Sequence, residues 1–94
     1  MSFYSEIIEL LLLSCERYKT KEISLDTYKD HVWKGANQLL KLEMKEIREF
    51  LKSAEAELDS IQHTTDSREI FEATLPVIRR IEYKLHSIKN EKME

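Results

Sequence analysis

The hydrophobic positions along this chain recur with the period of an α-helix. Near the N-terminus, apolar side chains stand three and four residues apart, at Tyr4, Ile7, Ile8, Leu11, Leu12, Cys15 and Tyr18. This spacing places them on one face of a helix over residues 3–19. Leu10 and Leu13 broaden that apolar face, which predicts that this helix is the most deeply buried one in the protein.

A second apolar stripe begins after a clear helix start signal. Ser24 is an N-cap residue, and Ile23 and Tyr28 occupy the two positions of a hydrophobic staple. From Tyr28 the stripe continues in phase to Ile61, so the pattern alone describes one helix about 55 Å long. A compact chain of 94 residues is only about 30 Å across. We therefore expect a break at Gly35, with helices over 25–35 and 37–61.

The last apolar stripe runs from Ile70 to Ile88 and follows a capping-box pair, Asp66 and Glu69. It predicts a helix over 67–89. Pro76 lies inside this stripe, and because the stripe keeps its phase across the proline, we expect a kink rather than a helix end. The chain is therefore predicted to be a single all-α domain, an antiparallel bundle of three to four helices.

The composition agrees with this fold class and excludes several others. One Gly and one Pro leave too few turn residues for a β-sandwich or barrel, and one Cys cannot form an internal disulfide. The longest apolar run, Leu10–Leu13, is far shorter than the ~20 residues that span a bilayer. The N-terminus lacks the basic start of a signal peptide. We expect a cytoplasmic protein that does not bind membranes.

Charge is distributed unevenly along the chain. A net charge of −3 argues against direct binding of nucleic acid. Residues 53–72 nevertheless balance to −5, with Arg68 as their one basic side chain, whereas the remaining 74 residues balance to +2. This acidic patch is either a solvated helix end with a capping pair or a docking surface for a basic partner. It consists of Glu55, Glu57, Asp59, Asp66, Glu69 and Glu72.

Other residues that could bind a metal or act as a nucleophile form weaker patterns. The sequence contains neither a D-x-D-x-D-G calcium loop nor a pair of Glu-x-x-His motifs. We interpret His63, between Asp59 and Asp66, as a hydrogen-bonding residue rather than a metal ligand. Cys15 lies on an apolar stripe and is interpreted as a buried, unreactive thiol. We therefore expect no metal and no cofactor.

Two further patterns leave other function classes open. Arg80 and His86 are separated by five residues, a spacing that resembles the signature of helical ribonucleases of the HEPN superfamily, which act on the scissile phosphate and its 2′-hydroxyl. On an undistorted helix these residues are about 120° out of phase, and Ile81 stands where that family usually has a polar residue. The second pattern, a heptad-like run from Leu39 to Ile61, would suit the seam of a homodimeric helical adaptor.

The first 38 residues combine an apolar helix containing Ile7–Leu13, a short polar link, and Ile23-Ser24 followed by Tyr28 and Trp33. This pattern resembles small helical immunity proteins of bacterial toxin systems, of the colicin D and contact-dependent inhibition kind. The chain departs from the common pattern at the link, where Lys21-Glu22 replaces a frequent Gly. In the second half, Phe50-Leu51 and then Glu57–Ile61 before a Thr-Thr-Asp loop are also similar to such proteins.

The resemblance implies a non-catalytic protein that binds one toxin domain and blocks its active site. Nuclease toxins of this kind are basic because they hold nucleic acid, and their inhibitors commonly present carboxylates in place of phosphates. The acidic patch, which the charge distribution defines without the resemblance, fits that expectation. We predict an immunity protein that binds a basic toxin, a nuclease, through Glu55, Asp59, Asp66 and Glu69, with Glu57 and Glu72 at the rim.

Overall fold

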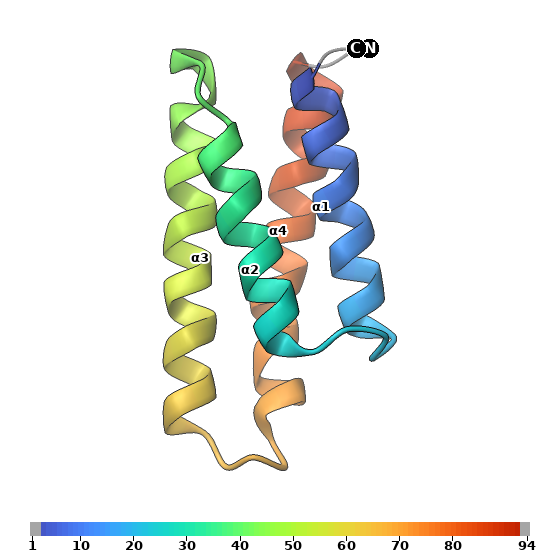
Figure 1. Ribbon diagram of the computed structural model, residues 1–94, viewed down its shortest axis with the longest axis vertical. Coiled ribbons are helices and arrows are strands. Elements are labelled where there is room, and N and C mark those ends of the chain that lie inside the picture. The colour runs from blue at the N-terminus through green and yellow to red at the C-terminus, as the bar shows by residue number, and fades with distance from the viewer. Residues whose placement is uncertain (1–2, 93–94) are drawn as a thin grey trace.

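The computed structural model describes residues 3–92 as four α-helices that run alternately up and down (Figure 1). The predicted all-α antiparallel bundle is therefore confirmed, and it has four helices. Neither a strand nor a helix long and apolar enough to cross a membrane occurs between residues 3 and 92. The elements are α1 (Phe3–Lys19), α2 (Leu25–Gln38), the 3-10 turn η1 (Leu42–Met44), α3 (Lys45–Thr64) and α4 (Ile70–Lys92).

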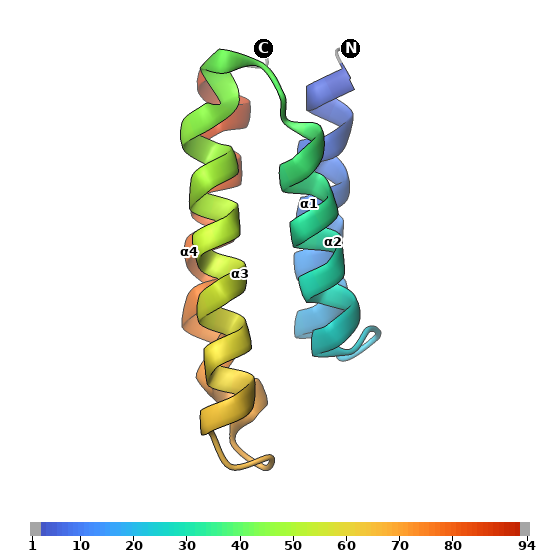
Figure 2. The ribbon, with the colours of Figure 1, turned by 60° about the vertical axis from the view of Figure 1, so that its left-hand side comes forward.

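Each helix packs against two neighbours, in the cyclic order α1, α2, α3, α4. Viewed from the side, α1 and α2 form one layer and α3 and α4 form the other (Figure 2). The bundle measures 40 × 22 × 18 Å. In both views the turn between α3 and α4 extends beyond the link between α1 and α2. Asp59, Asp66, Glu69 and Glu72 of the acidic patch thus lie toward a projecting end of the bundle.

The core consists of the positions that the hydrophobic pattern selects on each helix. Ile8 on α1, Tyr28 on α2, Leu51 on α3 and Leu85 on α4 have no exposed surface. The apolar residues that would have formed the seam of a coiled-coil dimer are buried here as well. Their side chains pack inside the bundle of one chain, at Leu39, Met44, Ile47, Leu51, Ala54 and Leu58.

Several buried polar groups join helices that are distant in sequence. Thr74 donates a hydrogen bond to the carbonyl oxygen of Phe71 at 2.7 Å, so the Tyr18 hydroxyl, 2.8 Å away, donates to Thr74 Oγ1. The Tyr18 ring also stacks on Tyr28, with centroids 5.3 Å apart. The Tyr28 hydroxyl lies 3.1 Å from Cys15 Sγ. The described side chains leave no buried nitrogen or oxygen without a partner.

The start of α2 follows the sequence prediction closely. The Ser24 hydroxyl accepts the N–H of Thr27 at 3.1 Å and caps the helix. Ile23 packs against the core and Tyr28 is fully buried, as expected for the two positions of a hydrophobic staple.

The predicted break at Gly35 is wrong in its position. The helix continues through Gly35 to Gln38 and ends at Leu39, whose ψ is 73°. The Leu39 side chain is buried, and the Arg48 guanidinium donates to its carbonyl oxygen at 2.5 Å. The helices predicted over 25–35 and 37–61 are therefore Leu25–Gln38 and Lys45–Thr64. Gly35 serves close packing instead, since a Cβ there would lie 2.8 Å from Cδ2 of Leu11.

The helix predicted over 67–89 is Ile70–Lys92. It begins later because Asp66 and Glu69 form a turn, in which the Glu69 N–H donates to the Asp66 carbonyl oxygen at 2.8 Å. The Glu69 carbonyl oxygen then accepts the N–H of Ala73. Pro76 lies within a continuous α4, and the kink there stays a prediction.

The broadened apolar face of α1 is only partly buried, and the expectation that this helix is the most deeply buried one stays a prediction. Leu10 is 63% exposed and Leu13 is 45% exposed. Helix α1 has only two neighbours, α2 and α4, so the part of its surface that faces away from both is open to solvent.

Tyr28 is the residue whose truncation should damage this bundle most. Tyr28→Ala removes a fully buried ring that contacts Tyr18 and Cys15, and we expect it to lower the free energy of unfolding by about 3 kcal/mol or more. Tyr83→Ala is the matched control: this ring is 78% exposed, so the change should stay within about 0.5 kcal/mol. Urea unfolding monitored by circular dichroism measures both, and equal losses would contradict the core described here.

Candidate interaction surfaces

The acidic patch lies along the last turns of α3, the turn after it, and the first turn of α4. Five of its six carboxylates belong to exposed residues, and Glu55 is half-buried. Asp66, Glu69 and Glu72 lie on the projecting turn and the start of α4, whereas the other three lie earlier, on α3. Asp59, Asp66, Glu69 and Glu72 therefore lie toward the projecting end of the α3–α4 pair, whereas Glu55 and Glu57 lie near the middle of α3.

The connecting turn holds Asp66 in a structural role. The Asp66 carboxylate accepts the backbone N–H of Arg68 at 2.9 Å, and its Oδ1 lies 3.4 Å from Arg68 Nε. At the preceding helix end, Thr64 donates its hydroxyl to the Ser60 carbonyl oxygen at 2.8 Å. Asp66 thus satisfies the backbone of its own turn, which limits how far it can reorient toward a partner.

The three carboxylates on α3 face different neighbours. Glu57 accepts a hydrogen bond from Arg80 Nη2 on α4 at 2.6 Å, and Asp59 accepts one from Lys29 Nζ on α2 at 2.8 Å. Residues two apart on a helix are about 200° apart around its axis, which is why this pair diverges. Glu55 and Asp59 are four apart and share the α2 side of the helix.

Asp59 belongs to a polar cluster between α2 and α3. Lys29, whose side chain is only 12% exposed, donates to Asp59 and, at 2.5 Å, to the Gln62 amide oxygen. The Gln62 amide nitrogen in turn donates to Asp26 at 2.9 Å. The hydrogen bond from Lys29 lowers the pKa of Asp59 below its ordinary value, so this carboxylate is ionised and internally paired.

The carboxylates left for a partner are those of Glu55, Glu69 and Glu72. No side chain among residues 4–90 forms a salt bridge with them, whereas the other three of the patch are paired. The charge that can act on an incoming molecule is therefore concentrated at the start of α4 and on the α2 side of α3.

The side chains that could bind a metal ion or act on a phosphate do not come together in one site. No three His, Cys, Asp or Glu side chains within the described residues are placed to hold a metal ion. Arg80 lines a shallow hollow of about 310 Å³ with Phe50 and Tyr83. His86 lines a second hollow of about 290 Å³ with Ser87 and Asn90, and Tyr83 lies between the two hollows and lines both. Arg80 and His86 are not brought into one pocket.

Cys15 is buried inside the bundle, next to Tyr28 of α2. It has no exposed area, and burial raises the pKa of its thiol to about 12, with the Tyr28 hydroxyl acting in the opposite direction. The reactive thiolate is therefore nearly absent at neutral pH.

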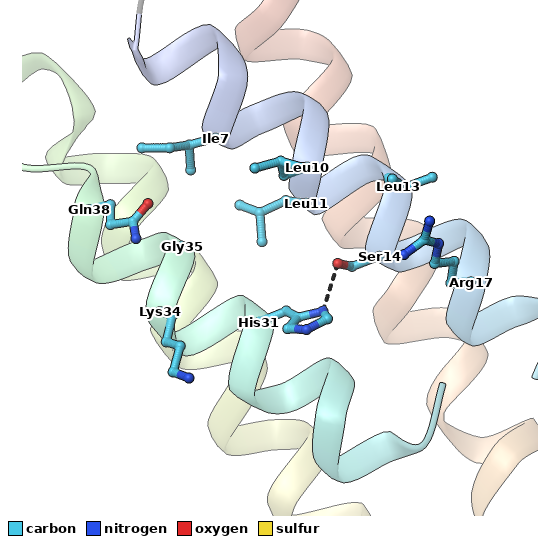
Figure 3. A pocket seen from close by; sticks show the side chains of 10 residues that line it. All are labelled: Ile7, Leu10, Leu11, Leu13, Ser14, Arg17, His31, Lys34, Gly35 and Gln38. Carbon is cyan, nitrogen blue, oxygen red and sulfur yellow. Dashed lines mark hydrogen bonds between the residues drawn. The ribbon is translucent and has the colours of Figure 1, made fainter. Parts of the chain in front are cut away.

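A groove between α1 and α2 is the feature that the sequence interpretation missed. Its volume is about 250 Å³, and Ser14 and His31 meet across it in a 2.8 Å hydrogen bond (Figure 3). The signal was present in the run Leu10–Leu13, because four consecutive residues cannot all face one core on a helix of about 3.6 residues per turn. The groove is lined by Ile7, Leu10, Leu11, Leu13, Ser14, Arg17, His31, Lys34, Gly35 and Gln38.

Comparison with models of protein families, with curated proteins and with solved structures finds no match to this chain. The function proposed below therefore depends on the geometry and charge of these surfaces.

The pairing of Lys29 with Asp59 should be visible in the titration of that carboxyl. Because the folded pKa of Asp59 is lowered from 3.8, the pair stabilises the fold above that pH, and the stabilisation is lost as the pH falls through the lowered value. In Lys29→Met the pKa of Asp59 should return toward its ordinary value, as followed by carboxyl NMR. Lys34→Met, which breaks a pair with Asp30 instead, should leave the Asp59 titration unchanged, and an identical shift in both variants would contradict the assignment.

Cys15 should be inert in the folded protein. We expect no reaction with a thiol-specific aromatic disulfide at neutral pH, because the thiol is buried and its pKa is raised to about 12. In denaturant one thiol per chain should react within the mixing time of the assay. Rapid labelling under native conditions would show that the α1–α2 contact opens readily.

Proposed function

We propose that this chain is a non-catalytic immunity protein that binds a basic bacterial toxin domain, a nuclease, through its acidic patch. The observation that best supports the proposal is the set of three carboxylates without a salt bridge to any described side chain, Glu55, Glu69 and Glu72. Two of them lie at the start of α4, next to the turn that projects beyond the α1–α2 link (Figure 2). Carboxylates presented in this way can occupy the positions that substrate phosphates take in a nucleic-acid cleft.

The patch would affect both the rate at which the toxin associates and the orientation in which it binds. Exposed charges at the rim of an interface mainly accelerate association and make it sensitive to salt, whereas a buried charge contact mainly slows dissociation. Glu69 and Glu72 are exposed, so they would steer the toxin toward the bundle end. Asp59 and Glu57, already held by Lys29 and Arg80, would present fixed oxygens with little further loss of side-chain freedom.

The proposal predicts that a toxin domain is encoded directly upstream of this chain, and that domain is the probe for its test. The variant Glu69→Lys/Glu72→Lys reverses two unpaired charges and should abolish protection of cells that express the toxin domain. In a stopped-flow experiment its association rate should fall by about tenfold or more, with a weaker dependence on salt. Its thermal stability should remain close to that of the parent, because both residues are exposed.

The matched control is Glu43→Lys/Glu49→Lys. Both residues are exposed, and they lie at the opposite end of α3, in η1 and the first turns of the helix. The change in net charge is therefore the same while the acidic patch is intact, and protection should persist. Equal loss of protection in both double variants would assign the effect to net charge, and full protection by Glu69→Lys/Glu72→Lys would overturn the role of the patch.

A further inference from the structure

The outward face of α1 carries an apolar stripe that nothing in the bundle covers. Leu10 and Leu13, 63% and 45% exposed, stand between two exposed charged residues, Glu6 and Arg17. The spacing along Glu6, Leu10, Leu13 and Arg17 alternates between four and three residues, which is the spacing of a seam between two paired helices.

The charges on this stripe are exceptional among those of α1. Glu9 pairs with Lys89, Glu16 pairs with Lys19, and Lys19 also pairs with Glu82 at 2.7 Å. The carboxylate of Glu6 and the guanidinium of Arg17, by contrast, have no side-chain partner among the described residues. One unpaired anion and one unpaired cation thus flank the exposed leucines on the same face.

We propose that this stripe binds a second copy of the chain, with the two α1 helices antiparallel. Glu6 stands four residues before Leu10, and Arg17 stands four residues after Leu13, so the stripe is symmetric about the midpoint of the two leucines. A two-fold axis through that midpoint places Leu10 of each copy against Leu13 of the other. The same operation places each Glu6 against the Arg17 of the other copy, so both unpaired charges are satisfied twice. An isologous contact requires this kind of self-complementarity.

The groove between α1 and α2 lies beside the exposed leucines and can receive side chains of the second copy. Leu10, Leu13 and Arg17 line its α1 wall and Lys34 lines its α2 wall (Figure 3), so leucines of the second copy have a hollow of about 250 Å³ beside them. A contact made by one helix and the rim of another is small and belongs with transient interfaces, which bury less than about 1,200 Å² in total. The dimer is accordingly expected to dissociate on dilution.

This dimer does not depend on the proposed function. The α1–α2 layer and the α3–α4 layer lie on opposite sides of the bundle (Figure 2), and most of the acidic patch belongs to the second layer. Pairing through α1 therefore leaves the patch of each copy open, and the assembly presents two such patches.

The test uses sedimentation velocity of the full chain over a wide concentration range. The parent should shift from monomer to dimer, and Glu6→Arg and Arg17→Glu should each weaken the dimer by about tenfold or more because they set like charges opposite each other. An equimolar mixture of these two variants should dimerise again. In the mixed dimer both positions are basic in one copy and acidic in the other, so opposite charges face each other at both contacts. The weakening by each single variant is the result specific to the antiparallel register, because a parallel pair would already set like charges opposite each other in the parent.

Two further variants separate the contact from unrelated effects. Leu10→Gln/Leu13→Gln should give monomer with unchanged thermal stability, because both side chains are exposed in the single chain. Glu43→Arg, in η1 at the surface, should dimerise like the parent. A parent that stays monomeric at every concentration, or a variant mixture that is not rescued, would overturn the proposal and leave the stripe to a different partner. Neither result would affect the toxin-protection experiment.

Discussion

The hydrogen bond between Tyr18 and Thr74 joins the end of α1 to α4 inside the core and constrains how the helices pack. It spans 56 residues at 2.8 Å in a site where Thr74 has no exposed surface. The buried Tyr18 hydroxyl would be costly without this acceptor, so the bond constrains the register of α1 on α4. The Tyr18 ring then positions Tyr28 by stacking, and Tyr28 reaches Cys15. These directional contacts constrain how α1, α2 and α4 are aligned along their axes, which apolar contacts alone do less strictly.

That register decides which surfaces remain open. With α1 and α2 in one layer and α3 and α4 in the other, each helix buries the sides that face its two neighbours and exposes the rest. The leucines of α1 that fall outside this angular range become an exposed stripe. The greater reach of the α3–α4 pair also carries the connecting turn and its carboxylates beyond the neighbouring helices, where solvent and a partner can reach them.

The charge of a segment of the sequence differs from the charge that its surface offers to a partner, because the packing of the helices decides which charged side chains pair with each other. Residues 53–72 are acidic by composition, but Lys29 and Arg80, from other helices, neutralise Asp59 and Glu57. The opposite holds on α1, where most charges are paired and Glu6 and Arg17 have no partner within the described part of the chain. An exposed charge without a partner among the described residues is the more informative feature, because it can act on an incoming molecule without first breaking an internal pair.

The sequence alone determined that this protein is an all-α bundle, which residues form most of its core, and where α2 begins. The reason is that the helix period, the N-cap and the apolar face of each helix are set by residues a few positions apart. Periodicity could not place the end of α2, since Arg48 holds the Leu39 carbonyl oxygen and Gly35 is needed for the approach of α1. It could not tell which of four successive leucines face the core, or which carboxylates stay unpaired. Those outcomes depend on the neighbours that each helix meets, and only the packing of all four helices supplies them.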